Sequence, residues 1–184
     1  MNTRPTRLTQ DVLRAIAAAD PQDTQGLSDE RLRGFIHGRA PLTPPERRLL
    51  ARSGVTRDRL AWLRHLERAR ALAAWEAQAL VAAPLQLLAA ADETPAVGPV
   101  RLVGAQYSVA LIPADLEGRA WRIAVQVSPP LVAATPGGFQ LVDSEGLVWL
   151  AGYPDAEGEL VGFWQRDEPL WPRVHRVRVE LVPQ

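Results

Sequence analysis

Hydrophobic residues in the first half of the chain recur every three or four positions, which predicts α-helices. The expected helices are one capped by Thr9 that runs through residues 16–19, a short one after Ser28 that stops at Gly38, one from Pro44 to Gly54, and a long one from Thr56 to Leu80. At 1.5 Å per residue the long helix would extend for about 37 Å. A four-helix domain of this size cannot cover a helix of that length by itself.

The start of the third helix carries the clearest local signal. Thr43 precedes Pro44 and Pro45, and Glu46 follows three residues after the Thr. In this pattern the Thr hydroxyl and the Glu carboxylate each accept a bond from the other residue's backbone amide. Pro at the first helical position has no amide to lose. The sequence therefore predicts a capped helix start at Thr43.

The second half alternates between apolar and polar residues, which predicts β-strands. The clearest strand spans residues 121–128, where four apolar residues alternate with four that are polar or small. The other predicted strands are Tyr107–Leu111, Phe139–Val142, Leu147–Tyr153, Leu160–Trp164 and Val174–Val182. Asp143–Gly146 and Asp155–Gly158 each begin with Asp and end with Gly, as type I turns prefer. Six or seven short strands with such turns predict a small antiparallel β-sandwich.

The change of pattern divides the chain into two expected domains. The stretch 92–99 has neither period and is predicted to be a linker between a helical domain, 1–91, and a β-sandwich domain, 100–184. The fold class is therefore α+β. Residues 1–95 hold 14 Arg against 11 acidic residues, and residues 96–184 hold 7 Arg against 10, so overall neutrality conceals a mild asymmetry.

Composition excludes several kinds of chemistry. The 184 residues include neither Cys nor Lys, which rules out thiol chemistry, Schiff bases, Cys-ligated zinc and a Walker-type phosphate loop. His37, His65 and His175 share no metal-ligand spacing, and no Ser lies in a G-x-S-x-G motif. We expect no enzyme activity, no metal and no cofactor. No signal peptide or membrane span is indicated, so the expected location is the cytoplasm.

Tryptophan is abundant, with six residues in the chain. Those on predicted strands, at positions 121, 149 and 164, are expected to fill the sandwich core. Trp62 and Trp75 lie on the long helix, where they either contact the rest of the protein or anchor a partner. Trp171 is predicted to lie in a Pro-rich loop.

The stretch from Leu27 to Arg48, and less closely the chain as far as Leu66, resembles the start of a bacterial anti-sigma factor domain. In that family a short helix that begins with acidic residues ends in an aromatic–aliphatic pair and Gly, and a "Leu-Ser/Thr-Pro-x-Glu-Arg" helix start follows. The family places two zinc-ligating Cys where this chain has Val55-Thr56-Arg57-Asp58. The resemblance therefore implies a zinc-less member.

The second half resembles transthyretin-like or carboxypeptidase-regulatory-like sandwiches. The resemblance rests on Leu141–Gly146 and Pro154–Leu160, which fit a recurrent "Asp-x-x-Gly" hairpin followed by an apolar strand. That family is a structural scaffold and implies no activity.

Together these resemblances imply a protein that sequesters a sigma factor through its helical domain. A long helix with an apolar stripe and no internal partner for its second half needs a groove in which to bury it. Arg64 and Arg68 would then meet an acidic rim on the partner. The expected partner-binding residues are Phe35, Leu49, Leu60, Trp62, Leu63, Leu66, Trp75, Leu80, Arg64 and Arg68.

Two other functions fit the same residues. In a DNA-binding helix-turn-helix, Gly54-Val55-Thr56 would form the turn, and Arg57, Arg59 and Arg64 would contact DNA. Against this reading, the second helix is longer than a groove needs and the net charge of the half is small, so direct nucleic-acid binding is not expected. In an adaptor or protease substrate, the helical module would bind a partner, and the sandwich or the 92–99 linker would be regulated.

Overall fold

The computed structural model describes residues 26–80, 82–87, 99–115, 120–164 and 166–184. The chain forms two compact units that divide between Glu67 and Arg68, inside one long helix. We call residues 26–67 the helical unit and the described residues from Arg68 onward the sheet unit. The helix predicted after Thr9 lies outside the described residues.

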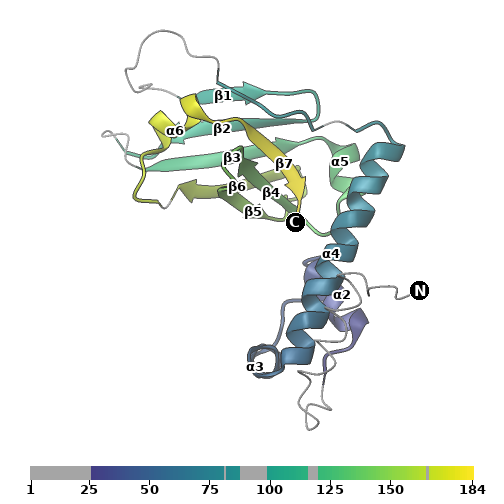
Figure 1. The fold of residues 1–184 in the computed structure, drawn as a ribbon. Coiled ribbons are helices and arrows are strands. Elements are labelled where there is room, and N and C mark those ends of the chain that lie inside the picture. The colour runs from purple at the N-terminus through teal and green to yellow at the C-terminus, as the bar shows by residue number, and fades with distance from the viewer. Residues whose placement is uncertain (1–25, 81, 88–98, 116–119, 165) are drawn as a thin grey trace, which may run out of the picture. The chain divides into compact units, whose positions relative to one another are not determined.

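The helical unit contains α2 (Asp29–Ile36), α3 (Pro44–Arg52) and the first part of α4 (Gly54–Ala77) (Figure 1). The capping box predicted at Thr43 is confirmed, since its hydroxyl accepts from the Glu46 amide and the Glu46 carboxylate accepts from the Thr43 amide. The start predicted for the long helix is wrong by two residues. The Ser53 hydroxyl accepts from the Thr56 amide at 3.0 Å, so Ser53 satisfies the amide that a cap at Thr56 would have left unpaired.

The sheet unit contains two antiparallel sheets, which confirms the α+β class. One has the order β1-β2-β3-β6 and the other β5-β4-β7. The strands are β1 (Val100–Val103), β2 (Tyr107–Pro113), β3 (Trp121–Val127), β4 (Phe139–Asp143), β5 (Val148–Gly152), β6 (Glu159–Trp164) and β7 (Val179–Pro183). Two short helices, α5 (Pro129–Ala134) and α6 (Leu170–Arg176), complete the unit.

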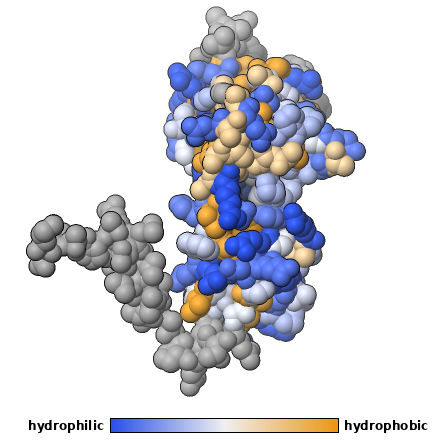
Figure 2. Space-filling view, turned by 90° about the vertical axis from the view of Figure 1, so that its right-hand side faces the viewer, coloured by the Kyte–Doolittle hydropathy of each residue, from blue (hydrophilic) through white to orange (hydrophobic). Residues whose placement is uncertain are grey.

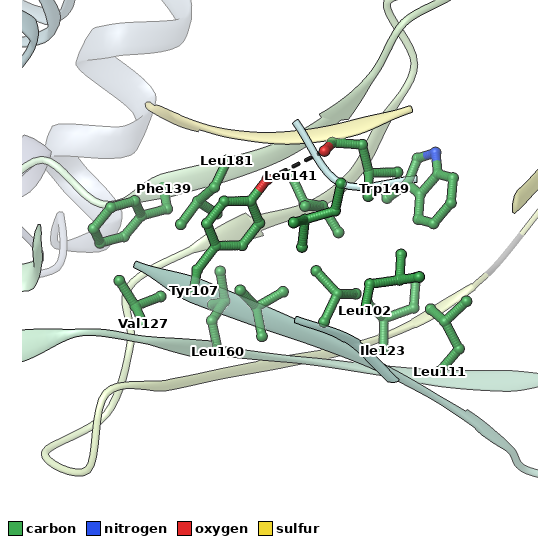
Figure 3. Packing of buried hydrophobic residues seen from close by; sticks show 14 of the residues in the cluster. Leu102, Tyr107, Leu111, Ile123, Val127, Phe139, Leu141, Trp149, Leu160 and Leu181 are labelled. Carbon is green, nitrogen blue, oxygen red and sulfur yellow. Dashed lines mark hydrogen bonds between the residues drawn. The ribbon is translucent and has the colours of Figure 1, made fainter. Parts of the chain in front are cut away.

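The two sheets face one another across a single hydrophobic cluster (Figure 3). Leu111 and Ile123 come from one sheet, Leu141 and Leu181 from the other, and none of the four is accessible to solvent. The strand tryptophans, Trp121, Trp149 and Trp164, are all buried in this cluster, as predicted. Because inward residues alternate with outward ones along each strand, the alternation seen in the sequence corresponds to one buried face.

Both predicted Asp–Gly turns are confirmed. The Gly146 amide donates to the Asp143 carbonyl at 2.9 Å, and the Gly158 amide donates to the Asp155 carbonyl at 3.1 Å. Both glycines have a positive φ near 80°, which a residue with a side chain adopts only with strain. Each Asp carboxylate also accepts from the backbone amides two and four residues later, which holds the turn closed.

The C-terminal region differs from the prediction. A single strand was expected over Val174–Val182, but the first part of that stretch belongs to α6 and only Val179–Pro183 forms a strand. Trp171 and His175 therefore lie on a helix rather than in a loop and a strand. The strand was predicted too long at its start because Val174 belongs to a helical pattern that begins before it, in which Leu170, Arg173 and Val174 form the buried face of α6.

The last two turns of α4 belong to the sheet unit. Trp75 is buried there, its indole N–H donates to the Thr135 hydroxyl at 2.8 Å, and its ring stacks on Phe139 at 6.4 Å between centroids. After the helix, Leu85 forms two backbone hydrogen bonds with Val179 and so covers part of the β7 edge. The second half of the long helix thus finds a partner within its own chain. The predicted linker at 92–99 falls almost wholly outside the described residues and stays a prediction.

Candidate partner-binding surface

The helical unit is built around four leucine and isoleucine side chains. Leu32 and Ile36 of α2 pack against Leu60 and Leu63 of α4, and all four are buried. Their spacing places each pair on one helix face, which is why these residues draw the two helices together. Leu60 and Leu63, both expected in the partner-binding surface, are therefore used by the unit's own core.

An ion pair joins α2 to α3. The guanidinium of Arg31 donates two hydrogen bonds to Glu46, of 2.6 and 2.7 Å, and further bonds to the carbonyls of Ala40 and Pro41. Glu46 also closes the capping box with Thr43. Arg31 and the Thr43 amide together lower the pKa of Glu46 to about 2. One carboxylate thus fixes both the start of α3 and its position against α2.

Two further carboxylates join α2 to α4. Asp29 accepts from Arg59, and this hydrogen bond lowers the pKa of the Asp29 carboxyl. Glu67, which is buried, lies 3.2 Å from His37 Nε2 and 3.7 Å from Arg33 Nε. The three helices are therefore joined to one another by ion pairs and a small aliphatic core.

The ten predicted partner-binding residues fall into three groups by exposure. Leu60, Leu63 and Trp75 are buried; Phe35, Leu49, Leu66 and Leu80 are half-buried; Trp62, Arg64 and Arg68 are exposed. Within the helical unit the structure brings together Arg64 and Phe35, since the guanidinium carbon lies 5.9 Å from the ring centre. This is a cation–π contact at the surface.

Trp62 is the most prominent exposed residue of the helical unit. Its side chain is 56% exposed, and Val55, also exposed, lies seven residues earlier and hence on the same side of α4. Leu66 follows one turn after Trp62 on that side. We call Val55, Trp62 and Leu66 the Trp62 stripe. Val55 was absent from the predicted set, although its spacing of seven from Trp62 was a usable signal.

The surface of the helical unit also carries many hydrophilic residues. Figure 2 shows the side of the molecule that faces right in Figure 1, where blue hydrophilic residues enclose smaller orange hydrophobic areas along the helices. Of the described residues between 26 and 67, nine are Arg and five are acidic. Three of those five acids, at positions 29, 46 and 67, already pair with basic side chains of the unit. The remaining exposed charge is therefore mostly positive.

The described residues include no group of three or more His, Cys, Asp or Glu arranged to hold a metal ion. His37 pairs with Glu67, whereas His175 contacts the ring of Trp171 at 4.7 Å between centroids. Within the same residues, no helix is both long enough and apolar enough to cross a membrane.

Comparisons with protein-family models, curated proteins and solved structures found no match to this chain. The fold is an N-terminal helical region followed by antiparallel sheets, and no family is identified by similarity.

Proposed function

We propose that this chain is a non-enzymatic regulatory protein that binds and sequesters a sigma factor through its helical unit. The observation that carries the proposal is the exposure of Trp62, with Val55 and Leu66 on the same side of α4. Tryptophan is enriched among the residues that dominate binding energy at protein interfaces. An exposed Trp flanked by apolar residues is typical of an anchor that inserts into a partner.

The energy at stake is sufficient to matter. A Trp side chain buries about 150–250 Å² when it is fully covered. Trp62 is 56% exposed, and a partner that covered this exposed part would contribute on the order of 2–3 kcal/mol at about 25 cal/mol per Å². Arg59, which is exposed and lies three residues before Trp62 on the same side of α4, supplies a charged group beside this apolar area. An apolar centre with an Arg rim is the usual composition of a protein interface.

The choice of a sigma factor comes from the resemblance of residues 27–66 to an anti-sigma domain. A zinc-less member of that family would need another means of joining its helices. The Arg31–Glu46 and Arg59–Asp29 ion pairs and the aliphatic core are such a means. The segment at the place of the zinc ligands opens α4 and is closed by the Ser53–Thr56 hydrogen bonds. These features support the proposal.

DNA binding through a helix-turn-helix is less well supported. The stretch expected to form the turn, Gly54–Thr56, lies in the first turn of α4, and Ser53 alone separates that helix from α3. Two of the three arginines expected to contact DNA already make contacts within the unit: Arg59 with Asp29 and Arg64 with Phe35. These contacts favour a protein partner over DNA.

The test is coexpression of the full chain with the sigma factor encoded beside its gene, followed by size-exclusion chromatography. We expect one peak that contains both proteins, and expect Trp62→Ala to separate them. Phe163→Ala is the matched control, because Phe163 is 59% exposed but lies on β6 of the sheet unit. Separate elution of the wild-type proteins would reject the proposal for that pair.

A further inference from the structure

Four exposed arginines lie along α3 and in the first turn of α4. Arg47, Arg48 and Arg52 lie on α3, Arg57 lies in the first turns of α4, and all four side chains are exposed. Arg48 and Arg52 are one helical turn apart and so lie on the same side. We call these four residues the basic patch.

Arg57 is drawn toward α3. Its Nη1 donates to the carbonyl of Ala51 at 2.7 Å, which is among the last carbonyls of that helix. A Cβ placed on Gly54 would lie 3.9 Å from the Nη2 of Arg57, which shows that the guanidinium folds back over the junction. The Arg57 side chain therefore folds back toward the end of α3 rather than projecting along α4.

The charge of the basic patch is not neutralised within the described chain. No described carboxylate forms an ion pair with any of its four guanidinium groups, whereas Asp29, Glu46 and Glu67 pair with other cations. A cation at the end of a helix is favoured by the helix dipole, which accounts for Arg52 and Arg57. It does not account for Arg47 and Arg48, which lie near the start of α3. Like charges one turn apart repel each other.

We propose that the basic patch binds an acidic segment of a protein partner. The inference rests on the proposed function in one respect, namely that the partner is the protein bound by the helical unit. Arginine suits this role because its planar guanidinium pairs with carboxylates through two parallel hydrogen bonds. Arg48 and Arg52 repeat at the pitch at which carboxylates repeat on a facing helix, about 5–6 Å.

A protein is favoured over a nucleic acid for two reasons. Exposed Val55 lies between Arg52 and Arg57 in the sequence, which adds an apolar contact that a phosphate backbone would not use. Four cations are also few for duplex binding. Affinity for a duplex grows with the number of phosphates that cations neutralise, and it falls steeply as the salt concentration rises. Nucleic acid is therefore the alternative that the experiment must distinguish.

The experiment measures binding of the full chain to two probes, poly-L-glutamate and a random-sequence 20-base-pair duplex, by fluorescence anisotropy in low and high salt. Arg48→Glu/Arg52→Glu reverses two charges of the basic patch, and Arg48→Gln/Arg52→Gln removes them without reversal. The matched control is Arg101→Glu/Arg166→Glu, two exposed arginines of the sheet unit without a described ion pair. Circular dichroism melting verifies that every variant folds.

We expect poly-L-glutamate to bind more tightly than the duplex, and binding to weaken at least tenfold in both patch variants and less than twofold in the control. Tighter binding of the duplex, no binding of poly-L-glutamate, or equal losses in patch and control variants would overturn the proposal. The coexpression test keeps the two proposals separate. If the sigma factor coelutes equally with wild type and with the patch variants, the basic patch is rejected and sequestration stands. If the sigma factor never coelutes but poly-L-glutamate binding depends on the basic patch, sequestration of that sigma factor is rejected and binding of an acidic segment by the basic patch stands.

Discussion

The Nε of Arg173 on α6 donates to Oδ2 of Asp143, at the end of β4, over 2.7 Å, and both side chains are buried. The same guanidinium reaches Glu168 at 2.5 Å and Glu145 at 3.0 Å. The indole N–H of Trp149 donates to the same Asp143 oxygen. This network attaches α6 and the C-terminal strand to the first Asp–Gly turn, so it organises one end of the sheet unit.

Removal of one partner of this pair is expected to be strongly destabilising. Arg173→Ala leaves the Asp143 carboxylate buried without its main cation, which typically costs about 3–5 kcal/mol. Urea denaturation, followed by Trp fluorescence, measures the loss. Arg176→Ala is the matched control, since Arg176 also pairs with Glu145 and Glu168 but is exposed, and its effect should be much smaller. Equal losses for the two variants would contradict the assigned role of the buried pair.

The same network predicts a loss of stability in acid. Burial raises the pKa of Asp143, but hydrogen bonds from Arg173, Trp149 and backbone amides outweigh it, so the pKa lies below its ordinary value of 3.8. A hydrogen bond from Arg176, with the nearby charge of Arg173, holds the pKa of Glu145 below 4.5, and hydrogen bonds from Arg176 and Arg173 do the same for Glu168. Groups with a lowered folded-state pKa stabilise the fold above their unfolded values.

The unfolding free energy should therefore be constant near neutral pH and decrease as the pH falls below about 4.5. Urea titrations from pH 7 to pH 2.5 measure this dependence. Asp143→Asn, which does not titrate, should be less stable at pH 7 and lose less on acidification. A wild-type unfolding free energy that increases as the pH falls from 4.5 to 3 would contradict the predicted loss of stability in acid.

Tyr107 predicts a loss of stability in alkali. Burial between the two sheets, seen in Figure 3, raises its pKa from 10.0 to about 12. Its hydroxyl lies 3.0 Å from the Ala83 carbonyl and 3.1 Å from that of Val179. Because the neutral phenol is favoured in the folded state, its contribution is complete below pH 10 and is lost as the pH rises to about 12.

Absorbance at 295 nm measures this titration, and Tyr153→Phe removes the other tyrosine of the chain. In that background the remaining phenol should ionise near pH 12 while folded and near pH 10 in urea. Tyr107→Phe should cost about 1–2 kcal/mol, because it removes the hydroxyl that donates to the Ala83 carbonyl and the second of two donors to the Val179 carbonyl. A folded-state midpoint at pH 10 would refute the assignment.

The two tryptophans of the long helix should respond differently to truncation. Trp75→Ala removes a buried ring together with its bond to Thr135, so it should cost about 3–5 kcal/mol. Trp62→Ala removes a mostly exposed ring and should change stability by less than about 0.5 kcal/mol. Thermal melting of both variants, monitored by circular dichroism, compares them directly. Similar losses would mean that Trp62 has a structural role that its exposure does not suggest.

Local features of the fold could be predicted because their causes lie close together in the chain. The capping box at Thr43 needs only Glu46, and the turn at Asp143 needs only residues up to Leu147. The burial of Trp121 follows from the alternation of its own strand. Each of these predictions depends on hydrogen bonds or periodicity within a few residues.

The predictions that failed depend on partners far away in sequence. Arg173 reads as a surface residue until Asp143 is placed beside it, and the helix that carries Arg173 includes the first residues of the predicted last strand. The boundary of α4 depended on which hydroxyl, that of Ser53 or Thr56, caps it. For the candidate surface, helical periodicity identified Leu60, Leu63 and Trp62 equally, but only packing against α2 separates the buried from the exposed.

By itself the sequence determined the α+β class, the switch from helices to strands, the two Asp–Gly turns and the absence of thiol and lysine chemistry. The tertiary structure alone decided that Trp75 belongs to the sheet core, that Trp62 stays exposed, and that the guanidinium of Arg57 folds back onto the end of α3. The physical reason is that periodicity shows which side of a helix is apolar, whereas burial depends on which other segment packs against that side.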